Sequence, residues 1–464
     1  MVDLLVRGGR VVTPEGIYQA DVAVEGETIA AVGHLAGRAW RTLDARGCLV
    51  LPGLVDAHVH MQCAAWNAVT PNDFGQGSVA AALGGVTTFI DFATQRRGRP
   101  MIEAVETLRS QADGRTVIDY GLHLSVTDAS LTTLREIEQI VAYGIPSFKM
   151  FMTYRSHDLM LDDAEILEVC RRVHECGGLP GVHAENDAIA TRNYARFEAE
   201  GRREARYHAE AKPTYAEAEA IQRALYLAQV AGSWLYVYHL STAEGVERVR
   251  QARRAGQPIL AETCTHYLTL DRSRLEGPEG YRYICSPPLR DVADQEALWS
   301  ALGDGTVSVV STDEAGFNAA DKAAAATGPL QAIPNGLPGV AVRLPVLFTL
   351  GVETGRLSLE RFVALNCSHP ARIFGLYPRK GVLAPGSDAD LIVIDPQRRV
   401  VLNRETQQMP VDWCAYDGLE VAGFPAYTVA RGRVLVDDYR FCGERGGGRF
   451  VPGNINPRHL ESLW

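Results

Sequence analysis

Several features that mark other classes of protein are missing from this sequence. Its 464 residues include 46 basic against 56 acidic side chains, so it lacks the basic excess of a nucleic-acid-binding protein. No uninterrupted apolar run approaches the roughly 20 residues that a membrane span needs. The start, MVDLLVRGGRVVTPEG, lacks the basic segment, apolar core and cleavage site of a signal peptide. We expect a cytoplasmic protein that binds neither nucleic acid nor membrane.

Paired cysteines are missing as well. The nine cysteines form no CxxC pair, and their number is odd. This argues against a zinc finger and against a disulfide scaffold. We expect reduced thiols, most of them buried.

The two ends of the chain have similar, strand-rich patterns. Apolar and polar residues alternate near residues 21–32, and β-rich runs recur at 390–395 and 427–436. The length suits one large α/β domain with a smaller one. We predict a small β-sandwich domain built from residues 1–52 and 376–440, a barrel over 53–375, and a C-terminal arm over 441–464.

The middle of the chain alternates apolar, β-branched runs with helical patterns, which is typical of a parallel sheet. Asp162 and Asp163 open one predicted helix, and Ser241 with Glu244 forms a capping-box pattern before another. Eight such units favour a TIM (β/α)8 barrel, with a doubly wound open sheet as the alternative. The eight runs are 49–60, 87–94, 119–126, 147–153, 179–185, 234–241, 258–266 and 306–313.

Polar side chains at the ends of these runs point to a metal centre. His58 and His60 are two residues apart on a strand, so both rings point to one side and can chelate one cation. Two hydrogen-bonded core histidines would show the same spacing. However, His183, His239 and Asp313 end other runs, and the strand ends of a barrel converge at one mouth. Histidine and carboxylate ligands suit zinc, with manganese or iron as alternatives.

Lys149 lies inside the apolar run SFKMF, where a lysine is costly to bury. An ammonium cannot bind a metal ion. A buried ion pair or a neutral amine would explain the residue. Carboxylation by carbon dioxide would instead give a bridging ligand, and would leave much less net positive charge beside two divalent ions.

The motifs extend over nearly the whole chain. They begin with LVRGGRVVTPEG and LPGLVDAHVH, continue through GIPSFKMFMTY, VHAEN, YHLST, ICSPPLR, STD and IPNGLPGV, and end in NCSHPARIFGLYPRKGVLAPGSDADLIVID. In this order they closely resemble the amidohydrolase superfamily, and within it the dihydropyrimidinase and D-hydantoinase group. The resemblance implies a homotetramer or homodimer, with the C-terminal arm at its interface.

The resemblance also implies a role for each site residue. Tyr154 would hydrogen-bond the developing oxyanion, and Ser286 and Asn335 would bind the cyclic amide. A binuclear centre would be held by two histidines per ion, a bridging carboxylated lysine and an aspartate on the first ion: His58 and His60, His183 and His239, Lys149, and Asp313.

The implied reaction is hydrolysis of hydantoins or 5,6-dihydropyrimidines to N-carbamoyl amino acids. A hydroxide shared by the two metal ions would attack the ring carbonyl, and Asp313 would carry its proton to the leaving nitrogen. Two alternatives stay open. One is an allantoinase-like enzyme, or another hydrolase of cyclic ureides or imides, on the same fold. The other is a non-catalytic binding protein related to dihydropyrimidinase.

The sequence departs from the group in the site loops. The stretch after His60 contains no arginine to pair with a substrate carboxylate, which argues against dihydroorotase and weakens allantoinase. The loop after His60 also lacks the glycine-rich sequence that is usual in the group. Glu314 stands where the group usually has histidine after the metal-binding aspartate. Four apolar side chains could line a pocket for a ring substituent, which would favour 5-substituted hydantoins: Met61, Trp66, Phe151 and Leu159.

Overall fold

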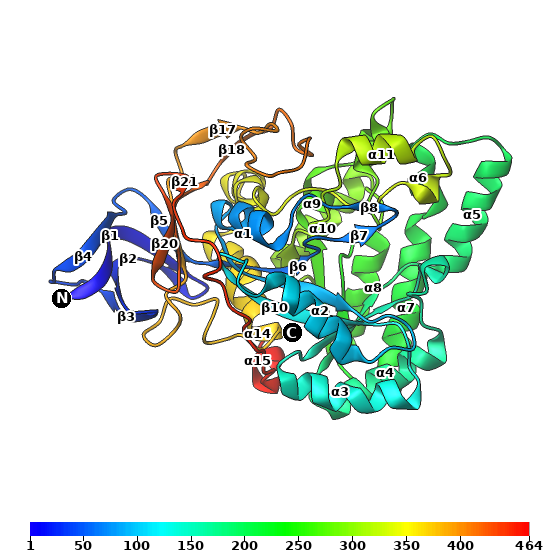
Figure 1. The fold of residues 1–464 in the computed structure, drawn as a ribbon, viewed down its shortest axis with the longest axis horizontal. Coiled ribbons are helices and arrows are strands. Elements are labelled where there is room, and N and C mark those ends of the chain that lie inside the picture. The colour runs from blue at the N-terminus through cyan, green and yellow to red at the C-terminus, as the bar shows by residue number, and fades with distance from the viewer. Residues whose placement is uncertain (464) are drawn as a thin grey trace.

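The computed structural model describes residues 1–463, and its larger part is a parallel barrel (Figure 1). The eight barrel strands follow one another around the sheet in chain order, and every neighbouring pair with a recorded register is parallel. They are β6 (Leu54–Val59), β9 (Val86–Thr94), β10 (Asp119–Val126), β11 (Ser147–Phe151), β12 (Leu179–His183), β13 (Leu235–Val237), β14 (Ile259–Cys264) and β15 (Val309–Ser311).

Helices cover the outside of the barrel, so its strands are buried on both faces. This confirms the predicted TIM barrel over the open sheet. The longer helices are α1 (Phe74–Leu83), α2 (Met101–Ala112), α3 (Leu131–Tyr143), α4 (Asp163–Glu175), α5 (Asp187–Ala199), α7 (Thr214–Ala231), α8 (Ala243–Arg254) and α10 (Val292–Asp304). The shorter ones are α6 (Arg206–Ala211), α9 (Thr265–Thr269), α11 (Ala319–Ala325), α12 (Arg343–Leu347), α13 (Leu359–Val363), α14 (His369–Ile373) and α15 (Pro457–Glu461).

Local capping fixes where two of these helices begin. Asp162 and Glu165 form the reciprocal capping box at the start of α4. The predicted capping box at Ser241 is wrong, because Thr242 caps α8 by accepting from the N–H of Gly245. The Ser241 hydroxyl instead bonds to the buried Glu217.

The first predicted run, 49–60, contains two strands in two different sheets. β5 (Leu49–Pro52) belongs to the β-domain, and β6 belongs to the barrel. The break falls at Gly53, where a Cβ atom would lie 2.1 Å from the Thr87 hydroxyl oxygen. Close packing against β9 therefore requires glycine at this turn.

Side chains join the last barrel strand to the first. The Thr312 hydroxyl donates to the Asp56 carboxylate at 2.7 Å. The buried Arg343 guanidinium donates to the carbonyl oxygens of Val310 at 2.7 Å and Val55 at 3.3 Å. These bonds hold β6 beside β15, and so place the residues that follow the two strands next to each other.

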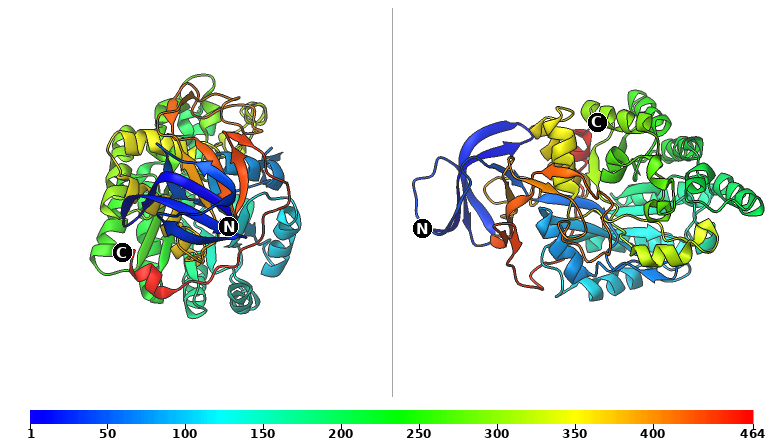
Figure 2. Two further views of the ribbon diagram at one scale, coloured as in Figure 1. Left: turned by 90° about the vertical axis from the view of Figure 1, so that its left-hand side faces the viewer. Right: turned by 90° about the horizontal axis from the view of Figure 1, so that it is seen from above.

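The second sheet has nine strands, and its N-terminal strands (blue) and C-terminal strands (orange) lie side by side at one end of the molecule (Figure 2). This confirms the predicted small β-domain. The domain boundaries remain a prediction. Its strands are β1 (Val2–Thr13), β2 (Gly16–Glu25), β3 (Thr28–Gly33), β4 (Ala39–Asp44), β5, β16 (Leu391–Ile394), β19 (Pro425–Ala430), β20 (Arg433–Asp437) and β21 (Arg440–Phe441).

Two segments near the C-terminus pack on the barrel. The pair β17 (Arg399–Val401) and β18 (Glu420–Ala422) lies outside the nine-stranded sheet, and Trp413 between them donates to the Phe317 carbonyl at 2.9 Å. The tail follows β10, where the Val451 N–H donates to the Tyr120 carbonyl at 2.8 Å. Trp464, the last residue of the predicted arm, lies outside the described residues. A role of the arm between subunits stays a prediction.

Two predictions from the sequence concern membrane-spanning segments and cysteines. No helix in them has the length and apolarity to cross a membrane. All nine cysteines are free, and five of them are buried.

Candidate metal centre and active site

The predicted metal ligands meet at the carboxyl-end mouth of the barrel. His58 lies in β6 and His60 directly after it, while Lys149 lies in β11 and His183 ends β12. His239 and Asp313 each follow their strand by two residues. Five strands thus contribute to one site, as the barrel architecture requires.

The first group is a compact cluster around the Asp313 carboxylate. Its Oδ1 atom lies 3.1 Å from His58 Nε2 and 3.3 Å from His60 Nε2. One potential ligand atom from each of these three residues lies within 4.8 Å of the others. Two imidazoles and a carboxylate at this spacing are a donor set suited to a divalent cation.

The second pair of histidines lies beside this cluster. The His183 and His239 ring centroids are 4.3 Å apart, and the His239 and His58 centroids are 5.5 Å apart. His239 is only 2% exposed, yet neither of its ring nitrogens has a hydrogen-bond partner among the described residues. A buried imidazole without partners is costly, so these nitrogens fit the binding of a metal ion.

Burial keeps these histidines in the form that binds metals. It lowers the pKa of His60 and of His183 to about 4, and that of His239 well below its usual range. At neutral pH the three imidazoles therefore carry no charge, and each keeps a lone pair for a cation.

Lys149 is buried beside the first group. Its Nζ lies 3.0 Å from His58 Nε2 and 4.2 Å from the Phe92 ring centroid. Of the ion pairs among residues 1–463, none includes Lys149, so a buried ion pair does not explain it. Burial lowers the pKa of its amine to about 8. A neutral amine is the form that can add carbon dioxide.

Buried carboxylates orient two of the histidines from behind. Glu262 of β14 accepts from His58 Nδ1, from the Tyr236 hydroxyl at 3.0 Å and from the His239 backbone N–H at 3.2 Å. Glu185 accepts from His183 Nε2 at 2.7 Å. A carboxylate fixes which ring nitrogen carries the proton and leaves the other for the cation.

The predicted substrate-binding residues lie around the second pair of histidines, His183 and His239. The Tyr154 ring centroid is 5.4 Å from that of His183. Ser286 donates to Glu185 at 2.7 Å, and Lys212 bonds to both residues. Near Asn335, the Gly336 N–H donates to the Ile284 carbonyl at 3.0 Å, so the Asn335 loop runs beside the Ser286 loop.

Three of the predicted site residues have an unusual backbone conformation. Tyr154, His239 and Asp313 have φ values of 66°, 38° and 48°. Residues other than glycine rarely adopt this left-handed backbone conformation, and such strained residues tend to cluster at functional sites.

Comparison with known proteins agrees with this geometry. The model of the amidohydrolase family matches residues 49–435. The D-hydantoinase of Ralstonia pickettii is 39% identical over 452 residues, which cover 97% of this chain and 98% of that protein. The solved D-hydantoinase from Bacillus sp. AR9 has a TM-score of 0.96 at 40% identity, with 98% of this chain and 100% of that chain covered. The dihydropyrimidinase from Brevibacillus agri NCHU1002 has a TM-score of 0.95 at 39% identity, with 97% and 99% covered.

The chain belongs to the amidohydrolase family. The predicted resemblance to its D-hydantoinase and dihydropyrimidinase group is confirmed, and with it the prediction of a hydrolase.

In this amidohydrolase the Glu314 side chain, directly after Asp313, connects neighbouring segments of the chain. Its carboxylate is fully buried and accepts from the backbone N–H groups of Gly339 at 2.6 Å and Val340 at 2.9 Å, and from the Asn72 amide at 2.8 Å. Burial raises its pKa to about 7. The residue thus ties the loop after β15 to the segments that carry Asn72 and Gly339.

The four candidate pocket residues do not form one group. The Trp66 ring lies 6.1 Å from that of Tyr154, and so does the Phe151 ring. Leu159 follows in the same loop, where its N–H donates to the Tyr154 carbonyl at 3.3 Å. Met61 is 4% exposed and packs against α1, where a Cβ atom at Gly77 would lie 2.4 Å from its sulfur.

Sequence reasoning missed the supporting carboxylates and Lys212. Glu262 and Glu185 were visible as charged residues within or at the end of apolar runs, the signal that identified Lys149. Lys212 precedes α7 and is 5% exposed. Nothing in its local sequence relates it to Ser286, which lies 74 residues away along the chain.

Proposed function

We propose that this protein hydrolyses the cyclic amide bond of hydantoins or 5,6-dihydropyrimidines to N-carbamoyl amino acids at a binuclear metal centre. The proposal rests on the buried imidazole of His239. Neither of its ring nitrogens has a hydrogen-bond partner in residues 1–463, and its ring lies beside those of His58 and His183. The names of the relatives support the substrate class, because they match over nearly the whole chain.

Each half of the site would hold one divalent ion. His58, His60 and Asp313 would bind the first, His183 and His239 the second. Lys149 would bridge them after its amine nitrogen adds to carbon dioxide and releases a proton. Zinc suits these ligands, and manganese or iron would fit as well. When bound, the ions would act as Lewis acids and lower the pKa of the attacking water.

The residues of the chain would position the substrate and move its protons. Backbone groups near Ser286 and Asn335 would bind the cyclic amide, with the susceptible carbonyl toward Tyr154. Asp313 would accept the proton of the attacking water and deliver it to the leaving ring nitrogen. The Tyr154 hydroxyl would donate to the oxyanion, and burial favours this because it keeps the pKa of the phenol well above its usual range.

The surroundings of the ring substituent would select among substrates. Trp66, Phe151 and Leu159 lie near Tyr154 and would offer an apolar wall, whereas Met61 lies apart from them, against α1. We further propose a homotetramer or homodimer located in the cytoplasm. The free cysteines suit a reducing compartment.

Initial rates of ring opening test the proposal. Dihydrouracil, hydantoin, an aryl-substituted hydantoin, allantoin and dihydroorotate are compared with metal and bicarbonate supplied. An Asp313→Asn variant purified in parallel excludes an enzyme of the expression host. Turnover of hydantoins or dihydrouracil is expected. Turnover of allantoin alone would select the allantoinase-like alternative, and a protein without bound metal or turnover would select the binding protein.

A further inference from the structure

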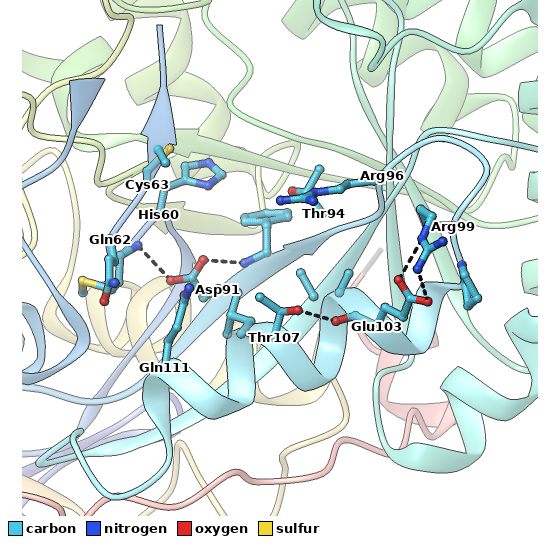
Figure 3. A pocket seen from close by; sticks show the side chains of 17 residues that line it. His60, Gln62, Cys63, Asp91, Thr94, Arg96, Arg99, Glu103, Thr107 and Gln111 are labelled. Atoms are coloured by element: carbon cyan, nitrogen blue, oxygen red, sulfur yellow. Dashed lines mark hydrogen bonds and ion pairs between the residues drawn. The ribbon is translucent and has the colours of Figure 1, made fainter. Parts of the chain in front are cut away.

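A cavity of about 390 Å³ opens beside the metal centre (Figure 3). Its wall includes His60 and the segment after it, the end of β9 with the following loop, and one face of α2. His60 therefore belongs both to the candidate metal cluster and to this cavity. A substituent on a bound ring could reach the cavity from the metal site.

Each charged side chain in the cavity wall has an ion-pair or hydrogen-bond partner, with one exception. Arg99 forms an ion pair with Glu103 at 2.9 Å. The buried Asp91 carboxylate accepts from the backbone N–H groups of Met61 at 2.8 Å and Phe92 at 2.6 Å. Arg96 has no side-chain partner among residues 1–463. In the view of Figure 3, its guanidinium lies across the cavity, between the His60 ring and the Arg99–Glu103 pair.

We propose that Arg96 makes this cavity an anion subsite, which binds a carboxylate carried by the substituent of the cyclic substrate. The inference rests on the proposed function and specifies its substrate class. A guanidinium offers two parallel N–H donors, which match the two oxygens of a carboxylate.

The surrounding charges are compatible with an anion. Glu103 is already neutralised by Arg99, which leaves Asp91 as the other carboxylate in the cavity wall. Both of its oxygens are engaged by N–H groups, and burial raises its pKa to about 7, which weakens its repulsion of a second carboxylate.

This arginine lies outside the stretch after His60, which contains no arginine of its own. Arg96 follows the next barrel strand, β9, and the barrel brings the two strand ends together. The absence of an arginine after His60 therefore does not exclude acidic substrates.

A pair of nearly isosteric substrates tests the subsite. We would measure kcat/KM for 5-(2-carboxyethyl)hydantoin and for 5-(2-carbamoylethyl)hydantoin, which differ chiefly in charge. The wild-type enzyme should prefer the carboxylate about tenfold, and added salt should reduce this preference because Arg96 is exposed.

Two variants test whether Arg96 is the source of the preference for the carboxylate substrate. Arg96→Gln should lower the ratio of the two kcat/KM values to about one. The double variant Arg99→Gln/Glu103→Gln, which removes the ion pair from the same cavity without changing the net charge, should keep the wild-type ratio. A ratio near one in the wild type, or an equal loss in both variants, would overturn the subsite while ring opening itself still supports the proposed function. If neither compound nor unsubstituted hydantoin is opened, the proposed function fails and this inference fails with it.

Discussion

The carboxylate of Glu262 should determine how tightly the first metal ion is bound, although it lies behind His58. It accepts from His58 Nδ1 and from the His239 backbone N–H, which directs His58 Nε2 toward Asp313. Without this acceptor, the ring can turn or change its tautomer, and Nε2 can carry the proton instead. The loss of such a supporting bond weakens metal binding by about 10–100-fold.

Two substitutions separate the hydrogen bond from the charge. Glu262→Met is similar in length but accepts nothing, so it leaves three buried donors unpaired: two N–H groups and the Tyr236 hydroxyl. It should lower the free energy of unfolding by about 1–3 kcal/mol for each group. Glu262→Gln can keep its carbonyl toward His58 and donate its amide to the Tyr236 hydroxyl oxygen. It should therefore weaken metal binding less than the methionine variant does.

The assay is the zinc content of each variant after dialysis in buffers of graded free zinc, with thermal unfolding of the metal-loaded protein measured alongside. Tyr236→Phe is the control, because it removes a bond only to the other oxygen of Glu262. Wild-type zinc affinity in the Met variant would refute the reasoning. Equal losses in the Met and Gln variants would show that charge, rather than the hydrogen bond, controls affinity. If the Met variant does not fold, the Gln variant alone still reports the contribution of charge.

Four further outcomes are expected. Lys149→Ala should lose activity and half of the bound metal, and a short carboxylic acid such as acetate should restore part of both, as metal analysis with rate assays can show. Tyr154→Phe should lower kcat/KM for hydantoin by about 100-fold at unchanged metal content, since one oxyanion donor is lost; an unchanged rate would remove Tyr154 from the mechanism. Glu314→Gln places an NH2 group among N–H donors and should lower the free energy of unfolding by about 1–3 kcal/mol, as calorimetry would reveal. Burial lowers the pKa of His208 to about 3, so the folded state binds fewer protons than the unfolded state between about 3 and 6.5; stability should therefore rise with pH across this window, and His208→Gln should flatten that rise in denaturant titrations.

Local patterns were sufficient to predict most of the barrel. Buried parallel strands give continuous apolar runs, and their spacing predicted eight strand–helix units without tertiary information. The same patterns could not show that residues 49–60 divide between two sheets, because the division depends on how closely Gly53 approaches Thr87. Nor could they choose between Ser241 and Thr242 as the cap of α8, since both can cap a helix and Glu217 bonds to Ser241.

The candidate site shows the same division. The sequence by itself determined the residue types at the strand ends, because the chemistry of binding a cation requires histidine and carboxylate there. Only the tertiary structure decided which groups stand behind and beside them. Glu262 meets His58 across 204 residues of chain, and Lys212 meets Ser286 across 74. Arg96 reaches the cavity beside His60 because two barrel strands are neighbours. Closure of the barrel brings these partners together. The sequence around each residue does not show which distant residue it will contact.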